Sequence, residues 1–294
     1  FNPDATRKIF TAKGRPSDNP LIVHIADRSF LHTLTPAFPE IGTTLANAFW
    51  PGPLTIVIHK SPGVTNEVTA GLDTVAIRMP NHPVALSLIR KFGRGIVAPS
   101  ANISGRPSPT TGQHVRDDLD GKIDCILDAG PTTIGVESTV LDITVDPPVI
   151  LRKGGLTREA IEAVIGKLGT GVGEELSRRS PGNRHRHYSP NAKVVLVKRG
   201  DSIGLGSLLA GLNTEKEHIG CILHSIPDPR SGPGLAIRRV SPDPAKMSHA
   251  LFDLLRTFDK MGIGLIIVEE VEEQGLGAAL MDRLRRASMA GTKK

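Results

Sequence analysis

The chain has 294 residues, of which 39% are hydrophobic and 22% charged, as in folded globular proteins rather than disordered ones. Aromatic residues make up only 3%, which argues against a surface that stacks the bases of single-stranded nucleic acid. The net charge of +6 favours an anionic partner but leaves open whether it is a nucleotide, tRNA or another polyanion.

The cysteines, the histidines and the apolar runs limit the classes of protein further. The apolar runs, such as 265–268, are far too short to span a membrane. With only Cys125 and Cys221, both in strand-like runs, a disulfide framework is disfavoured and a reducing, cytoplasmic location is expected. The ten histidines show no metal-ligand spacing, so we assign no residue to a metal site.

The first half of the chain predicts an α/β domain. A helix is expected from Pro3 to Lys13, with Asn2 as N-cap and Gly14 at its end. Two further helices are expected at 83–92 and 157–165. Strand-like runs lie at 21–25, 54–58, 75–79, 96–98, 125–127, 139–143 and 149–151. Their irregular spacing favours a mixed, twisted sheet.

The second half begins with a linker. Glycines and prolines break any regular pattern over 166–190, and the end of this stretch is basic through Arg178, Arg179, Arg184 and Arg186. Beyond it, strands at 193–197, 219–223 and 264–268 alternate with helices near 204–212, 244–261 and 275–287, which predicts a small Rossmann-like parallel α/β domain. We therefore expect an α/β domain over 1–168, a linker over 169–192 and a C-terminal α/β domain over 193–294.

The stretch VAPSANISGRPSP, at 97–109, places small polar residues directly after a predicted strand. Ser100, Asn102 and Ser104 offer hydroxyl and amide groups, and Gly105 allows a ligand to approach the backbone closely. Ligands of open α/β sheets bind at the carboxyl ends of strands, so we favour a binding site here. The alternative is a capped turn that leads into a helix at Gly112.

Cations mark three other places. Lys13 and Arg15 flank Gly14 on a rigid turn, where they suit phosphate oxygens; the alternative is that they complement the dipole of the preceding helix. Arg78 lies in an apolar strand and needs either a pocket or a salt bridge. Ser138 precedes one strand and Arg152 ends the next.

Known nucleotide and nucleophile motifs do not occur. The P-loop pattern fails, since Gly166-Lys167 is followed by leucine, and no glycine pair has the context of a dinucleotide fold. No Ser-His-Asp arrangement or carboxylate pair stands out. We therefore expect binding and charge stabilisation to carry any catalysis.

Taken together, these residues resemble the threonylcarbamoyl-AMP synthase family, the YrdC-like enzymes of tRNA modification, in its long two-domain form. The resemblance runs through the Lys-x-Arg and Ser-x-Asn pairs and the stretches 19–25, 49–55, 75–78, 137–140 and 180–190, in the right order over nearly the whole chain. It is weakest from 193 onward. It implies a YrdC-like mixed-sheet domain followed by the small parallel α/β domain.

The resemblance implies a reaction in which L-threonine, bicarbonate and ATP give threonylcarbamoyl-AMP and pyrophosphate. A tRNA threonylcarbamoyl-transfer complex then uses the product to modify the adenosine beside the anticodon. Magnesium is the expected ion, binding mainly through the phosphates.

Site residues follow position by position from the resemblance. The catalytic set that it implies is Lys13, Arg15, Ser100 and Asn102. The implied ATP contacts are Arg15, Asn19, Thr74, Ser100, Ser108, Arg152 and Tyr188. The implied threonine contacts are His24, Arg78, Ala98 and Ser138. We also expect the segment 180–190, with Arg184, Arg186 and Tyr188, to close over the nucleotide as a lid.

Two other functions stay open at this point. A non-catalytic RNA-binding module would explain the net charge and the basic run near 178–186, with weak RNA binding as its main property. A carbamoyl-adenylate-forming maturation enzyme ranks last, because its zinc-finger and acylphosphatase-like segments are absent from this sequence. Since the chain opens at Phe1, directly before a helix, we expect that a family segment of the Thr-Glu-Thr-x-Tyr-Gly type, which helps to hold threonine, precedes it.

Overall fold

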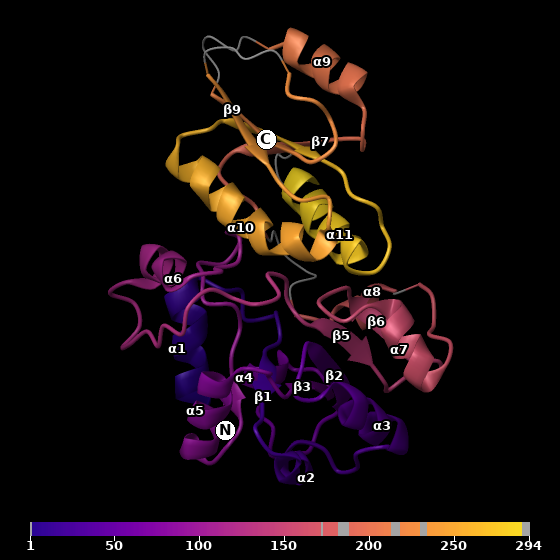
Figure 1. Ribbon diagram of the computed structural model, residues 1–294. Coiled ribbons are helices and arrows are strands. Elements are labelled where there is room, and N and C mark those ends of the chain that lie inside the picture. The colour runs from indigo at the N-terminus through magenta and orange to yellow at the C-terminus, as the bar shows by residue number, and fades with distance from the viewer. Residues whose placement is uncertain (1, 172, 182–187, 213–217, 230–233, 290–294) are drawn as a thin grey trace. The chain divides into compact units, whose positions relative to one another are not determined.

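A computed structural model describes residues 2–171, 173–181, 188–212, 218–229 and 234–289 (Figure 1). The chain divides into two compact units. The first comprises Phe1–Ser104, Asp118–Ala129 and Glu137–His185, and the second comprises Gly105–Asp117, Gly130–Val136 and Arg186–Lys294. The second unit thus contains two segments from the first half of the sequence, between stretches that belong to the first unit.

In the described part of the first unit, six strands form one sheet in the order β4-β1-β3-β2-β5-β6. The β1–β3 and β2–β5 pairs are parallel, while β1–β4, β2–β3 and β5–β6 are antiparallel. This confirms the predicted mixed sheet. The strands are β1 (Ile22–His24), β2 (Leu54–His59), β3 (Thr74–Arg78), β4 (Ile96–Val97), β5 (Thr139–Asp142) and β6 (Val149–Arg152).

The two faces of this sheet are covered unequally. A large apolar cluster that includes Val23, Ile56 and Ile77 fills one face. It joins the sheet to the helices α3 (Glu40–Phe49), α5 (Pro83–Phe92) and α7 (Arg158–Ile165). The opposite face carries a much smaller cluster, to which Ile22 and Ala76 belong. Since side chains alternate along a strand, the neighbours of Val23 and Ile77 all point to this second face.

The three helices predicted for the first unit begin and end within one residue of the bounds that the sequence indicates. In the first helix, Asn2 accepts hydrogen bonds from the main-chain N–H groups of Asp4 and Ala5, and Gly14 ends it with φ 58°, a left-handed conformation that glycine adopts easily. The remaining helices are η1 (Arg28–Phe30), α2 (Leu31–Leu34), α3 (Glu40–Phe49), α4 (Asn66–Thr69), α5 (Pro83–Phe92), α7 (Arg158–Ile165) and α8 (Glu174–Ser177), after α1 (Pro3–Lys13). Helix α6 (Gly112–Leu119) begins in the second unit and ends in the first.

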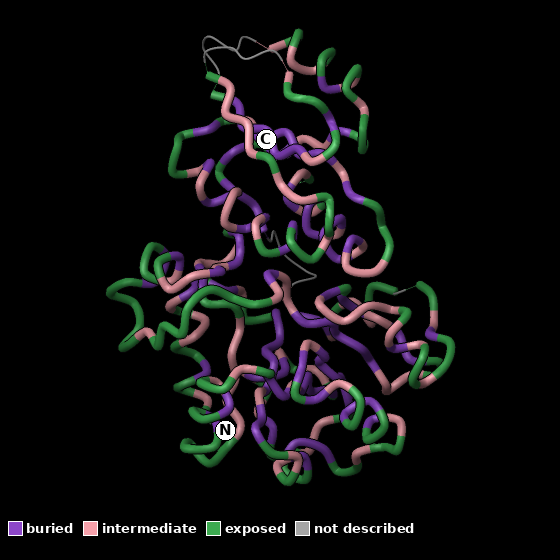
Figure 2. The backbone as a smooth tube through the Cα atoms, viewed as in Figure 1, coloured by how far each residue is buried: buried purple, intermediate pink, exposed green. Residues whose placement is uncertain are grey.

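In the second unit, the described residues form a four-stranded parallel sheet in the order β7-β10-β8-β9. One face packs on α10 and α11, and the other packs on α9 (Figure 1). The central strands β8 and β10 are largely buried, the outer strands β7 and β9 are less so, and the outer sides of the helices are exposed (Figure 2). The elements are β7 (Lys193–Val197), α9 (Ser202–Ala210), β8 (Ile219–Leu223), β9 (Leu235–Arg239), α10 (Pro244–Lys260), β10 (Leu265–Glu269) and α11 (Leu276–Met289).

One secondary-structure prediction was wrong, and several elements were not predicted. The segment 125–127 is not a strand; it lies in an irregular loop, and Leu127 is 62% exposed. Its apolar run is only three residues long and no neighbouring strand pairs with it. Strand β9, helix α3 and the short helices η1, α2, α4 and α8 were not predicted. The outer strand β9 ends in Arg238 and Arg239, which hide the apolar pattern of a strand.

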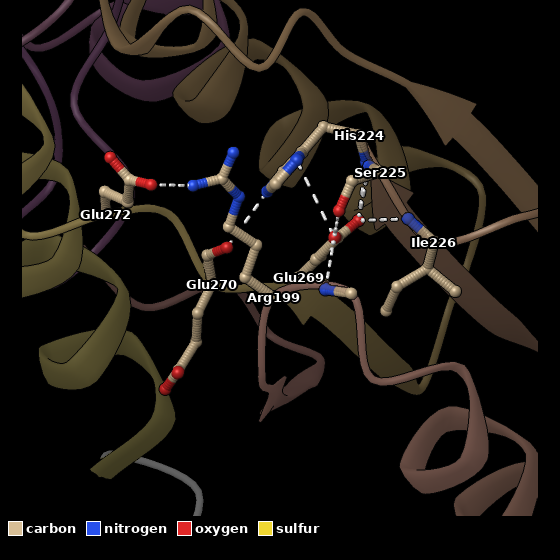
Figure 3. Close-up of polar contacts among 8 residues, drawn as sticks. Arg199, His224, Ser225, Ile226, Glu269, Glu270 and Glu272 are labelled. Atoms are coloured by element: carbon tan, nitrogen blue, oxygen red, sulfur yellow. Dashed lines mark hydrogen bonds and ion pairs between the residues drawn. The ribbon is translucent and has the colours of Figure 1, made fainter.

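A buried carboxylate ties together the loops of the parallel sheet (Figure 3). Glu269, at the end of β10, is 0% exposed and accepts hydrogen bonds from the main-chain N–H groups of Gly200, His224, Ser225 and Ile226 at 2.7–3.1 Å, and from the Ser225 hydroxyl. Burial raises the pKa of Glu269, but these hydrogen bonds outweigh it and lower the pKa to about 2. The loops after β7 and β8 are thereby joined to the end of β10.

We expect Glu269→Gln to lower the free energy of unfolding by about 3 kcal/mol at pH 7, since an amide cannot replace a charged acceptor of several N–H groups. The exposed Glu272→Gln, which removes only the ion pair with Arg199, should cost less than about 1 kcal/mol. Urea unfolding measures both. Because a lowered carboxyl pKa stabilises the fold only while the group is ionised, the Glu269→Gln deficit should be constant from pH 7 to 5 and shrink below about pH 4.5. Equal stability of the two variants would contradict this role.

Candidate functional site

The end of α1 places a buried lysine against the polar stretch after β4. Lys13 is 4% exposed, and its Nζ donates to the carbonyl oxygens of Ser100, at 2.5 Å, and Asn102. The Asn102 side-chain oxygen lies 3.4 Å from the same Nζ. Burial, together with the charge of Arg15, lowers the pKa of Lys13 to about 7. The structure therefore brings three of the four predicted catalytic residues into direct contact.

The fourth member of this set, Arg15, is fixed just before β1. It is 8% exposed, and its guanidinium donates to the carbonyl oxygens of Asn19 and Pro20 at 3.3 and 2.9 Å. Asn19 is itself fully buried. We call Lys13, Arg15, Asn19, Ser100 and Asn102 the lysine cluster; it lies at the start of β1.

A second group of predicted residues lies at the opposite end of β1. His24 and Arg78 end the neighbouring parallel strands β1 and β3 and are register partners. The Nδ1–H of His24 donates to the Ile22 carbonyl at 3.2 Å, and the Arg78 Nε donates to the Gly52 carbonyl at 3.0 Å. Burial and the charge of Arg78 lower the pKa of His24 to about 3, so this imidazole is neutral at pH 7.

Ser138 and Arg152 join this second group. The Arg152 guanidinium is 8% exposed and donates to the Ser138 carbonyl at 2.8 Å and to its hydroxyl at 3.1 Å. The Ser138 hydroxyl also lies 2.7 Å from the hydroxyl of Thr55, whose residue pairs with Arg78 across β2 and β3. We call His24, Thr55, Arg78, Ser138 and Arg152 the arginine cluster.

The arginine cluster concentrates positive charge. Burial, and then the charge of Arg152, lowers the pKa of Arg78 to about 10. The guanidinium groups of the buried Arg152 and the partly buried Arg78 are close enough to repel each other, which is unfavourable unless something else favours the arrangement. An anionic ligand would relieve the repulsion, so the arrangement suits phosphate or carboxylate recognition.

The predicted site residues on the strands share one face of the sheet. His24, Thr55, Thr74 and Arg78 alternate with residues of the large apolar cluster and so point to the thinly covered face. Thr74 begins β3, at the end opposite Arg78, and is buried. Ala98 is held by its N–H, which donates to the Ile22 carbonyl at 3.1 Å.

Two predicted ATP contacts belong to the second unit. Ser108 is buried there, and Tyr188 lies 5.6 Å from Phe252 between ring centroids, with the Arg283 guanidinium 4.9 Å from the Tyr188 ring. Arg184 and Arg186 of the expected lid lie outside the described residues.

Two features of the site were not assigned from the sequence. Thr55 was noted in the stretch 49–55 but received no role, although its position two residues after Pro53 at the start of a strand resembles that of the other polar strand-end residues. A Cβ on Gly154 would lie only 2.3 Å from the Ser138 carbonyl carbon and 2.4 Å from the Glu137 oxygen. Glycine is therefore required there for β6 and its following turn to pass so close to Ser138.

The basic linker is partly accounted for by ion pairs. Arg179 contacts the fully buried Asp142 at 3.2 Å, and Arg178 contacts Glu174 at 2.7 Å.

Among the described residues, no three His, Cys, Asp or Glu side chains gather in a way that would hold a metal ion. None of the described helices combines the length and apolar character that a membrane span needs.

Comparisons with known proteins show the family of the chain. A family model described as telomere recombination matches residues 1–154, and one described as threonylcarbamoyl-AMP synthase, C-terminal domain, matches residues 156–289. The threonylcarbamoyl-AMP synthases of Pyrococcus abyssi and Bacillus subtilis are each 46% identical to this chain, over 97% and 98% of it and 84% of each relative. The crystal structure of P. abyssi Sua5 complexed with L-threonine has a TM-score of 0.89 and 45% identity, over 98% of this chain and 85% of that one. The chain belongs to the threonylcarbamoyl-AMP synthase family.

Proposed function

We propose that the chain makes threonylcarbamoyl-AMP and pyrophosphate from L-threonine, bicarbonate and ATP. Family membership over both halves of the chain supports the activity. The observation that carries the proposal is the set of cations in the first unit, of which Lys13, Arg15 and Arg152 are buried and Arg78 is partly buried, because each substrate or its reacting group is anionic.

The proposed ATP contacts at the start of β1 and the proposed threonine contacts at its other end lie in different clusters. β1 has three residues, which span about 10 Å at the usual rise per strand residue, and an ATP molecule is long enough to reach along it. The proposed ATP contacts at the start of β1 are Arg15, Asn19 and Ser100. The proposed threonine contacts His24, Arg78 and Ser138 lie at its other end, and Ala98 lies beside Ile22.

The proposed reaction centre is where Arg152 donates to Ser138. Arg152 is assigned to ATP and Ser138 to threonine, so their contact brings the two substrates together. There, an oxygen of the carboxylated threonine amine attacks the α-phosphorus, and the bond from that phosphorus to the pyrophosphate oxygen breaks. The cations stabilise the charge on the phosphoryl oxygens and the leaving group, and no side-chain nucleophile is needed.

The neutral His24 has a consistent role in this proposal. With its pKa lowered to about 3 it adds no charge beside Arg78 at physiological pH. Its Nδ1–H is engaged by the Ile22 carbonyl, so its Nε2 can accept a hydrogen bond from the threonine hydroxyl or ammonium group.

Further parts of the proposal go beyond the activity itself. Magnesium would accompany the ATP phosphates and shield their charge, as it does where protein ligands are few. The product would pass to a tRNA threonylcarbamoyl-transfer complex in the cytoplasm. We also keep as proposals the domain boundaries 1–168, 169–192 and 193–294, the closure of 180–190 as a lid, and the ATP contacts of Thr74, Ser108 and Tyr188.

The activity is tested with the purified protein, ATP, radiolabelled bicarbonate and each amino acid in turn. We expect pyrophosphate release and a labelled adenylate with threonine. No signal above the blank with threonine would refute the proposed function. A steep dependence of tRNA binding on salt, without turnover, would instead support the RNA-binding alternative.

We expect Lys13→Ala and Arg15→Ala each to lose most activity while remaining folded. Removing one preorganised charged contact from a transition state costs about 2–4 kcal/mol, which corresponds to a fall of about 30- to 1,000-fold in rate. Lys8→Ala, on the exposed side of the same helix, is the matched control and should retain full activity. Unchanged turnover in both variants would show that Lys13 and Arg15 have only a structural role.

Lys13 also makes stability depend on pH. Its pKa is lowered from 10.5 to about 7 in the folded protein, so the unfolded chain binds more protons between these values and stability rises with pH. The free energy of unfolding of the wild type, relative to Lys13→Met, should increase by about 2 kcal/mol from pH 7 to pH 9. Urea unfolding at the two pH values measures this, and a difference that does not change with pH would contradict the buried lysine.

A further inference from the structure

Two segments of the first half of the chain fold as part of the second unit. These segments, 105–117 and 130–136, are joined to each other where the Thr132 N–H donates to the Thr110 carbonyl at 2.9 Å. The first of them carries Ser108 and follows the Ser100–Asn102 stretch directly. We call 105–110 the serine loop.

Helix α10 holds the serine loop through a buried arginine. Arg256 is 7% exposed, and its Nε and Nη2 donate to the Pro107 carbonyl at 3.1 and 2.5 Å. Neither Pro107 nor Pro109 has an N–H, so the main chain around Ser108 has few hydrogen-bond donors with which to fix itself. A guanidinium that grips the carbonyl immediately before Ser108 restricts where its hydroxyl can lie.

The same helix holds the rest of the two segments. Asp253 accepts from His114 at 3.2 Å and Lys260 donates to Asp117 at 2.7 Å. Since the Nδ1 of His114 accepts the Thr110 N–H at 3.2 Å, its Nε2 carries the proton that faces Asp253. With Arg256 these residues follow a spacing of three and four, which puts them on one side of α10.

The segment 130–136 approaches the helix even more closely. The Ser248 hydroxyl donates to the Ile134 carbonyl at 2.7 Å. A Cβ on Gly135, whose φ is +79°, would lie 2.3 Å from the Ser248 carbonyl oxygen. Contact at this distance requires glycine, so the packing of 130–136 on α10 is built into the sequence.

The serine loop begins directly after Ser104, which contacts Lys13. The Ser104 N–H donates to the Lys13 carbonyl at 2.9 Å, and Pro107, the residue held by Arg256, follows after only Gly105 and Arg106. Only two residues separate Pro107 from Ser104, and Ser108 follows Pro107 directly. A displacement of Pro107 is therefore expected to move both serines.

We propose that Arg256, on the C-terminal domain's helix α10, is a positioning residue for ATP binding: it fixes the serine loop so that Ser108 meets the nucleotide. This rests on the proposed function and gives the C-terminal domain a role in the reaction. It predicts an effect on ATP rather than on threonine, because none of the proposed threonine contacts lies on the serine loop.

The test compares Arg256→Met and Arg256→Lys with the exposed control Arg239→Met, which removes only an ion pair with Asp228. Steady-state kinetics give KM for ATP, KM for threonine and kcat, and hydrogen exchange follows peptides that cover 103–112. Arg256→Met should raise KM for ATP about tenfold, with KM for threonine within about twofold, and should speed exchange in the serine loop. Arg256→Lys, which keeps a cationic donor, should partly restore both the KM for ATP and the slow exchange of the serine loop. Arg239→Met should match the wild type.

Wild-type KM for ATP and wild-type exchange in a folded Arg256→Met variant would overturn the proposal. So would a loss of kcat alone in proportion to the unfolded fraction, because that shows a structural role only. If the wild type released no pyrophosphate, the proposed function would fail separately. Exchange in the serine loop and ATP binding by calorimetry would then still decide whether Arg256 positions it.

Discussion

The structure depends on burying positive charge beside main-chain carbonyls. Lys13, Arg15, Arg78 and Arg152 each donate to carbonyl oxygens, which orient a cation without cancelling its charge. The lowered pKa values of Lys13 and Arg78 show the cost of this arrangement. The rest of the first unit supports it, because a thick apolar cluster on one face of the sheet leaves the other face available for these polar side chains.

Much of this could be predicted from residues that are close in the sequence. Alternating apolar residues predicted β2 and β3, and Asn2 and Gly14 predicted both ends of α1, because each signal acts within a few residues. The strand expected at 125–127 failed because pairing, not composition, makes a strand, and no partner lies beside it. Lys13 and Arg15 could be found as cations on a turn, but the buried state of Lys13 could not, because its Nζ is held by residues almost ninety positions away.

Contacts across longer separations could not be predicted at all. Arg256 and Pro107 are 149 positions apart, and nothing near either residue indicates that a loop of the first half folds with the C-terminal domain. Glu269 received no role in the sequence analysis, yet it joins the loops after β7 and β8 to the end of β10. In both cases a buried charged side chain of the second unit fixes main-chain groups that are far from it in the sequence, and no local sequence pattern indicates the contact.

The central claim is that anionic substrates offset the charge of the buried and partly buried cations of the first unit. The most direct measurement is the free energy of unfolding of the wild type and of Arg78→Met, with and without ATP, threonine and bicarbonate together. The account predicts that Arg78→Met is at least as stable as the wild type without substrates and gains much less from adding them. A variant that is less stable than the wild type without substrates, and is stabilised equally by them, would contradict it.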